Sequence, residues 1–379
     1  MKAMWSAGAS RKPPVPEASE APAEAGIVFV IPPGRPPSGG DLYNRFLLRA
    51  LKAEGSRFGS TTLDRLEAGA CAPGTEFWVD SLYIRALAAA DPFGPHDRLF
   101  FIIHSLPSED PGVPPEAAAA LRLAEDRLFG RAEGFLVTGP RTRKVLEDRG
   151  FAGRPILLVP PAPCVLPKGP PKARAAFSGL IVSSLIRGKG VPGFLEALGR
   201  EVRAGDAFEI RIAGRTDIEP DTAAACLKAI GAHPVLKERV FHLGFIPYEE
   251  MGSEYERSSV LISPSPSETF GMAFHEARAF GLPILAVRAP YSEPFITQGQ
   301  TGLLFDSTAE LARGALELVR QPQRMRELAA STAESGPAAT PTWAGAARSF
   351  LSQRRTYAIV RPGPGGGTPP QFPKKAMKS

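Results

Sequence analysis

The sequence contains no long hydrophobic run. Its longest apolar stretches, such as Ile27–Ile31 and Leu99–Ile103, have the length of a buried strand, whereas a membrane-spanning helix needs roughly 20 apolar residues. The apolar core of a signal peptide is also missing, because Lys2 is followed by small, polar and proline residues. These absences predict a cytoplasmic protein that is at most peripheral at the inner face of the membrane.

Cysteine is scarce. Cys71, Cys164 and Cys226 are odd in number and widely spaced, and no Cys-x-x-Cys pair occurs. Such a set builds neither a disulfide framework nor a zinc site. We therefore expect ordinary thiols and no bound metal.

A dense lysine and arginine run with interleaved aromatic residues is absent, although the net charge is +6. Scattered basic residues are typical of a solvated surface, so no nucleic-acid partner is expected. One basic strip lies on the first expected helix and consists of Arg45, Arg49 and Lys52 beside Phe46 and Leu47. A strip of this kind can face anionic lipid head groups, which leaves a peripheral membrane contact open.

The chain is long enough for more than one domain, and strand-like and helix-like segments alternate along it. A chain of 379 residues exceeds one ordinary core and predicts two domains of similar size. The many prolines and glycines gather partly at the ends, where residues 1–25 are rich in Ala, Pro and Glu and residues 359–379 have no pattern that buries a face. We expect both ends to be disordered tails, the second of them basic.

Strand-like apolar runs alternate with helix-compatible stretches, which predicts an α/β fold with parallel sheets. In the first domain, residues 26–165, these runs lie at 27–31, 77–79, 99–103, 134–138 and 156–159. Prolines interrupt the alternation from Pro160 to Lys172, and we place a proline-rich linker at 166–176. In the second domain, residues 177–340, the runs lie at 177–182, 209–214, 240–244, 260–263 and 284–287.

The most informative segment runs from Ser263 to Ala286 and reads S-P-S-P-S-E-T-F-G-M-A-F-H-E-A-R-A-F-G-L-P-I-L-A. It joins a strand end to a helix that starts near Met272. The free N–H groups and the dipole of such a helix start suit the phosphates of a ligand, and Glu276 can accept hydrogen bonds from hydroxyls. Taken alone, the pair Glu268 and Glu276 would more simply cap a helix or face water.

The same segment resembles the signature of the family-four retaining glycosyltransferases, also called glycosyl transferases group 1. There, Glu-x-Phe-Gly is followed by a second Glu and then by Ala-x-Ala-x-Gly-x-Pro. Every position matches in this chain: Glu268, Phe270, Gly271, Glu276, Ala277, Ala279, Gly281 and Pro283. The resemblance implies that Glu268, Phe270, Gly271 and the adjacent Met272 hold the donor sugar, and that Glu276 bonds to the nucleotide ribose. It also implies the GT-B fold: two Rossmann-like domains facing a central cleft, with a terminal helix at 341–358 returning to the first domain.

A second motif lies in the loop from Ser183 to Gly190. It is similar to the family's Gly-Arg-Leu-x-x-x-Lys-Gly, whose Arg and Lys grip the donor phosphates. Lys189 matches the lysine, but Ser184 stands in the arginine position. Two alternatives follow: Arg187 supplies the second charge, or Lys189 and backbone N–H groups hold the phosphates alone.

Two features of the first domain also fit the resemblance. His104 follows an apolar strand, where family members often carry a histidine near the donor sugar, although a lone histidine is more often structural. Gly39 and Gly40 lie in the loop that would close over the donor diphosphate and the acceptor. Next to His104, Ser108, Glu109 and Asp110 could meet the acceptor, but surface acids are the simpler interpretation.

The resemblance implies a retaining, metal-independent glycosyltransferase that moves a sugar from a nucleotide-diphosphate sugar to an acceptor hydroxyl. Its catalytic set would be Glu268, His104 and Lys189, with Glu268 orienting the sugar during a front-face displacement. Lys189 and the helix start near Gly271 would stabilise charge on the departing diphosphate. The resemblance does not decide whether the acceptor is a glycan, a lipid-linked sugar or a small molecule. Polysaccharide biosynthesis is one process in which such a transferase would act. The alternative is a degenerate, non-catalytic module that binds sugar nucleotides, for which the serine at 184 is the main argument.

Overall fold

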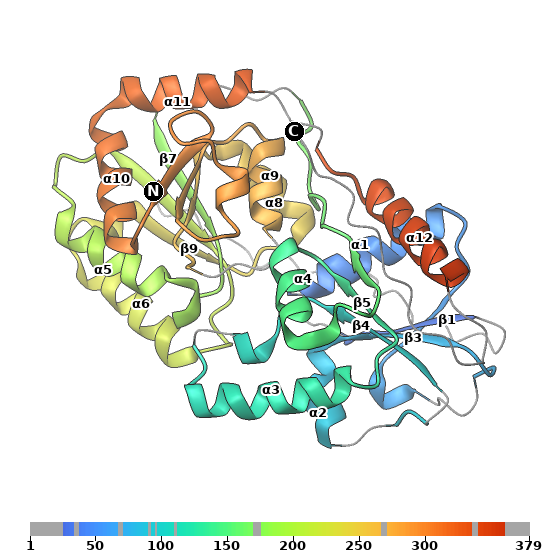
Figure 1. The fold of residues 1–379 in the computed structure, drawn as a ribbon. Helices are drawn as coiled ribbons and strands as arrows, with labels where there is room; N and C mark the ends of the chain where they lie inside the picture. The colour runs from blue at the N-terminus through green and yellow to red at the C-terminus, as the bar shows by residue number, and fades with distance from the viewer. Residues whose placement is uncertain are drawn as a thin grey trace, which may run out of the picture.

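The computed structural model describes residues 26–33, 38–66, 71–89, 92–94, 97–109, 112–169, 176–266, 271–335 and 340–360. Within these ranges the chain forms two parallel sheets, each covered by helices on both faces (Figure 1). This confirms the α/β fold class. The predicted tail at 1–25 and the middle of the predicted linker, 170–175, lie outside the described residues. Of the predicted tail at 359–379, residues 361–379 also lie outside them, whereas 359 and 360 belong to the last helix.

The first sheet has the strand order β2-β1-β3-β4-β5-β6. Its strands are β1 Ile27–Val30, β2 Gly59–Thr61, β3 Glu76–Asp80, β4 Arg98–Ile103, β5 Gly134–Val137 and β6 Ile156–Leu158. The helices around it are α1 Gly39–Ala53, α2 Ile84–Ala89, α3 Pro115–Phe129 and α4 Pro140–Leu146, with the short helical turns η1 Leu63–Arg65, η3 Ser81–Tyr83, η4 Pro107–Glu109 and η5 Glu147–Phe151.

The second sheet has the order β12-β11-β10-β7-β8-β9. Its strands are β7 Phe177–Val182, β8 Phe208–Ala213, β9 Val240–Gly244, β10 Val260–Ser263, β11 Ile284–Val287 and β12 Gly302–Phe305. Its helices are α5 Val191–Glu201, α6 Pro220–Ala232, α7 Leu236–Arg239, α8 Tyr248–Arg257, α9 Met272–Ala279, α10 Thr308–Arg320 and α11 Pro322–Glu334, with the turns η6 Arg187–Lys189 and η7 Glu293–Phe295.

Burial on both faces explains why the strands read as nearly continuous apolar runs. Successive side chains of one strand enter opposite cores: Phe101 of β4 packs in one core of the first sheet and Phe100 in the other. The sequence runs at 177–182 and 240–244 coincide with β7 and β9. The short strands β2 and β12 were not predicted; β2 in particular has the sequence Gly-Ser-Thr, which lacks an apolar run.

The last helix, α12 Trp343–Val360, packs on the first sheet beside α1 (Figure 1). Phe350 enters the core of that sheet, where its ring centroid lies 5.0 Å from that of Trp78. Gln353 bonds to both the N–H and the carbonyl of Leu158, at 3.0 and 2.9 Å. The chain therefore returns from the second sheet to complete the first.

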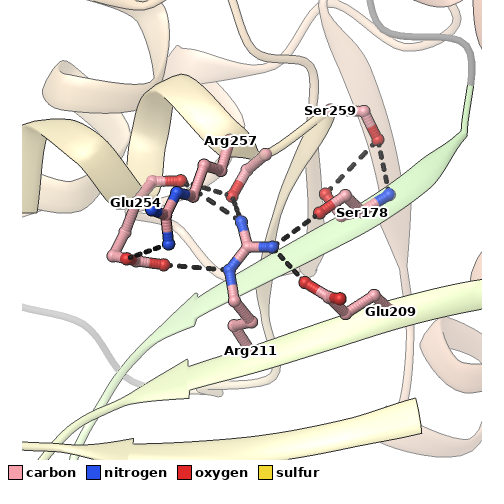
Figure 2. Close-up of polar contacts among 7 residues, drawn as sticks. Ser178, Glu209, Arg211, Glu254, Arg257 and Ser259 are labelled. Carbon is pink, nitrogen blue, oxygen red and sulfur yellow. Dashed lines mark hydrogen bonds and ion pairs between the residues drawn. The ribbon is translucent and has the colours of Figure 1, made fainter. Parts of the chain in front are cut away.

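A buried arginine ties helix α8 to the second sheet (Figure 2). The guanidinium of Arg211, on β8, donates to the Glu254 carboxylate of α8 at 2.9 Å. It also donates to the hydroxyls of Ser178 and Ser258, at 3.0 and 2.9 Å, and pairs with Glu209. Because α8 carries Tyr248 and Tyr255, this network positions two side chains that reach toward the first domain and toward α9.

Candidate functional site

Helix α1 forms the contact between the two halves of the molecule (Figure 1). The Phe46 ring stacks on Trp343 of α12, with centroids 5.4 Å apart, and meets the Tyr248 ring of α8 edge-on at 5.1 Å. The Arg45 guanidinium lies 5.9 Å from the centre of the Tyr248 ring. Leu47 is buried in the core, Phe46 packs against α8 and α12, and Arg45 lies over Tyr248 of α8, whereas Arg49 and Lys52 are exposed. A membrane contact through this strip stays a prediction.

Within the described part of the chain, no helix combines the length and the apolar character that crossing a bilayer requires. In the same residues, no three His, Cys, Asp or Glu side chains are grouped so that they could hold a metal ion.

Glu276 lies on α9 and is buried. The Tyr255 hydroxyl donates to its Oε2 at 2.6 Å, and the backbone N–H of Cys164 donates to its Oε1 at 3.1 Å. Burial raises the pKa of Glu276 to about 7, although these bonds and one from the Val165 backbone lower it in part. The carboxyl group thus joins α8, α9 and the segment that leads out of the first domain. Each carboxylate oxygen still has capacity for another donor, such as a ribose hydroxyl.

The start of α9 is built on Gly271, which has a φ of +57°. A Cβ at this position would overlap the phenol of Tyr291, so both the backbone angle and the available space favour glycine. The next residue, Met272, lies against Cys164, with the two sulfur atoms 3.8 Å apart. The α9 N-terminus therefore faces the segment that comes from the first domain. Glu268 and Phe270 precede it and lie outside the described residues.

The loop after β7 carries the predicted phosphate ligands. Ser184 and Lys189 are half-buried. At Gly190, φ is +70° and a Cβ would lie 2.1 Å from the carbonyl oxygen of Pro264, so this loop packs directly against the loop after β10. Lys189 thus lies at the same edge of the sheet as the segment that leads to α9.

Arg187 is exposed. Its backbone N–H donates to the Glu219 carboxylate at 3.0 Å. Arg187 also lines a cavity of 460 Å³ between α5 and α6, together with residues that include Pro192, Leu195 and Thr222.

His104 follows β4 and is 1% exposed. Its Nε2 lies 3.1 Å from Asn44 Oδ1 and 3.1 Å from Asp80 Oδ2. Because both neighbours are acceptors there, Nε2 carries a proton and donates. A Cβ on Gly40 would come within 3.1 Å of the imidazole, so the structure brings two predicted residues, Gly40 and His104, into contact.

The prediction that Gly39 and Gly40 lie in a loop is wrong, because they are the first two residues of helix α1, which Ser38 and Asp41 cap reciprocally. The Ser38 N–H donates to the Asp41 carboxylate at 2.7 Å, and the Asp41 N–H donates to the Ser38 hydroxyl at 3.3 Å. In contrast, Ser108 is not free to meet an acceptor, because its N–H and hydroxyl donate to buried Glu125 at 2.9 and 2.6 Å. Glu109 is exposed, and Asp110 lies outside the described residues.

Several residues of the site were not predicted. Asp80 and Asn44 hold His104, and Tyr255 holds Glu276. Asp80 had a signal in the sequence, because a carboxylate ends an otherwise apolar strand. Asn44 and Tyr255 had none, since each lies in the middle of an ordinary amphipathic helix.

The family comparison matches the second sheet and its helices. Residues 176–336 match the family described as Glycosyl transferases group 1. The α-D-kanosaminyltransferase of Streptomyces kanamyceticus is 30% identical over 162 residues, which are 42% of this chain and 40% of that protein. The α-monoglucosyldiacylglycerol synthase of Acholeplasma laidlawii is 30% identical over 81 residues, 21% of this chain and 20% of that protein. The matches therefore span less than half of these relatives.

Solved structures match over nearly the whole fold. The sucrose-phosphate synthase of Thermosynechococcus elongatus has a TM-score of 0.68 at 18% identity, covering 88% of this chain and 99% of that chain. The Anabaena protein HepE, solved in complex with UDP and glucose, has a TM-score of 0.65 at 15% identity. The match covers 87% of this chain and 99% of that chain. The chain thus has the GT-B fold, and its residues 176–336 match the glycosyl transferases group 1 family.

Proposed function

We propose that the protein is a retaining glycosyltransferase that moves a sugar from a nucleotide-diphosphate sugar to an acceptor hydroxyl without a metal ion. The observation that carries this proposal is the setting of Glu276. Its buried carboxylate lies on α9 at the edge of the second sheet, against the segment from the first domain, and retains capacity for a hydroxyl donor. A nucleotide ribose is a ligand with such hydroxyls.

The electrostatics support a phosphorylated donor. The first N–H groups of α9 have no side-chain cap at Gly271 and carry the positive end of the helix dipole. Lys189 lies in the neighbouring loop. Together they would offset the negative charge that develops on the departing diphosphate, which is the role that oriented donors and cations play in other group transfers.

In this proposal the sugar lies between the two sheets. Glu268, Phe270, Gly271 and Met272 would hold it from the second domain, and His104 and the start of α1 at Gly39 and Gly40 would approach it from the first. Asp80 and Asn44 fix the imidazole of His104 in one orientation. The acceptor would attack from the face that the nucleotide leaves, with the leaving phosphate oxygen taking its proton.

Proteins of the same fold support the donor class. HepE was solved with UDP and glucose, and the pneumococcal O-GlcNAc transferase GtfA with UDP and GlcNAc. The named activities of the curated relatives differ in acceptor, so we propose the class only as a glycan, a lipid-linked sugar or a small molecule.

A thermal-shift panel of UDP, GDP, ADP, dTDP and CMP, with and without magnesium, tests the proposal. A nucleoside diphosphate that binds the native state raises the melting temperature. We expect one of them to do so equally with and without the metal. No shift with any nucleotide, or a shift that requires magnesium, would count against this function.

The second candidate is a non-catalytic module that binds sugar nucleotides, favoured by the serine at position 184. Turnover separates the two. Glu268→Ala and Lys189→Ala should each abolish release of nucleoside diphosphate from the donor that the panel identifies. A wild-type protein that binds this nucleotide but shows no such release would establish the module instead.

A further inference from the structure

We propose that Arg215 supplies the second cation for the donor diphosphate, beside the position that Ser184 occupies. This inference rests on the proposed function and deepens it. A diphosphate carries more negative charge than Lys189 alone can neutralise, so a second cation at the same sheet edge is expected. Arg215 follows β8, the strand next to β7 in the sheet.

The backbone places Arg215 directly beside Ser184. Val182 at the end of β7 pairs with Ala213 at the end of β8. The pairing continues past the strands, since the Ser183 N–H donates to the Ala213 carbonyl and the Leu185 N–H donates to the Arg215 carbonyl, both at 2.9 Å. The side chain of residue 215 therefore starts from the same edge as the loop that carries Lys189.

The guanidinium of Arg215 also lies near the first domain. The pKa of Arg215 is raised mainly by its hydrogen bonds to the Asp217 carboxylate. The negative charge of Asp41 raises it further. Asp41 is in the first turn of α1, directly after Gly39 and Gly40. The electrostatic influence of Asp41 is consistent with Arg215 lying on the side of the second sheet that faces the start of α1, where the proposed diphosphate would bind.

The present partner of Arg215 can be exchanged for a phosphate. Asp217 receives two bonds from the guanidinium, at 2.9 and 2.8 Å, but its side chain is 63% exposed. Exposed ion pairs are weak because water and salt screen them. A diphosphate offers the same two-oxygen geometry with greater charge, and arginine suits such a planar, bidentate contact.

Arg187, the alternative cation, is less well placed. It lines the α5–α6 cavity, and its backbone is held by Glu219. It therefore serves as the matched control: an exposed arginine on a neighbouring loop of the same sheet edge.

The test is calorimetric binding of UDP, and of uridine as the same ligand without phosphates, to wild type and variants. If the thermal-shift panel identifies another base, the corresponding pair is used. The Arg215→Ala variant loses one charge-assisted contact, so its dissociation constant for UDP should be about 10-fold to 100-fold higher than that of the wild type. Uridine binding should not change. Arg187→Ala should bind both ligands as the wild type does.

Two further variants keep the test independent of folding defects. Asp217→Asn retains the guanidinium and removes its competitor, so UDP should bind more tightly. Ser184→Arg added to Arg215→Ala should restore UDP binding. Wild-type UDP affinity in Arg215→Ala, or a loss that appears in Arg187→Ala instead, overturns this proposal alone. A wild-type protein that binds no nucleoside diphosphate overturns the proposed function as well.

Discussion

Glu276 shows how burial and hydrogen bonding set the charge of one side chain. Burial raises its pKa from the ordinary value of 4.5 to about 7. Between these two values the native state holds more protons than the unfolded chain, in which the carboxyl group is already ionised. The contribution of Glu276 to stability is therefore full below about pH 4.5 and is lost as the pH rises through about 7.

We expect Glu276→Gln to remove this dependence. Across that pH window, the free energy of unfolding of the wild type relative to the variant should fall by up to about 3 kcal/mol. Urea unfolding followed by circular dichroism at several pH values measures the difference. Glu250→Gln, an exposed change on α8, is the control and should leave the wild-type profile intact. Parallel profiles for the wild type and Glu276→Gln would contradict the assignment.

At the scale of elements, two features decide how the site is held: the anchoring of α8 and the start of α9. Arg211 attaches α8 to β8 through a buried network (Figure 2). Gly271 lets the chain enter α9 at a left-handed backbone angle beneath Tyr291. Together they place Tyr255 beside Glu276.

Arg211→Met should leave the Glu254 carboxylate buried without its cation and destabilise the protein by about 3–5 kcal/mol. Replacing both partners, as Arg211→Met with Glu254→Leu, should recover much of that loss, because no uncompensated charge remains. Arg257→Ala is the control, since its side chain is 69% exposed and it makes a longer contact with Glu254; it should cost no more than about 1 kcal/mol. Urea unfolding gives these free energies when the dependence of the unfolding free energy on urea concentration is the same for all variants. A double variant less stable than Arg211→Met would refute the argument.

Gly271→Ala should be more destabilising than Gly299→Ala. Both glycines have a positive φ, +57° and +77°, so alanine costs about 1–2 kcal/mol at either position from the backbone alone. At Gly299 the added Cβ meets nothing within 4 Å, whereas at Gly271 it meets Tyr291. We expect Gly271→Ala also to lose binding of the nucleotide that the panel identifies. Equal melting temperatures for the two variants would show that the Tyr291 contact relaxes without cost.

At the scale of the whole molecule, the chain passes between the two sheets twice, and Trp343 joins the two passages. Its indole Nε1 donates to the carbonyl of Pro163 at 3.0 Å, on the first passage. Its ring packs on Phe46 and Tyr43 of α1, at 5.4 and 5.5 Å, as the second passage enters α12. The orientation of the two domains therefore depends on contacts between segments 180 residues apart.

Trp343→Ala should destabilise the protein by about 2 kcal/mol, because the ring is half-buried and its full removal leaves a gap. Trp343→Phe keeps most of the packing and loses the hydrogen bond, so it should cost about 1 kcal/mol. Circular dichroism during urea unfolding measures both without relying on tryptophan fluorescence. A phenylalanine variant as unstable as the alanine variant would mean that the bond to Pro163, rather than the ring, carries the contact.

The amino-acid sequence alone was enough for those features that depend on neighbours along the chain. Apolar runs of strand length predicted β7, β9 and β10 closely, because a buried parallel strand must be apolar on both faces. The motif around Gly271 marked the start of α9, since it combines glycine, a helix start and a stop at Gly281–Pro283.

Only the tertiary structure decided which side chains meet. The partners of His104 lie 24 and 60 residues away, and the Cys164 N–H that reaches Glu276 lies 112 residues away. Local periodicity carries no information on such pairs, so it did not indicate that Phe46 packs between Trp343 and Tyr248. The sequence thus determined the elements and the motif, and the packing of the two sheets determined the environment of each functional group.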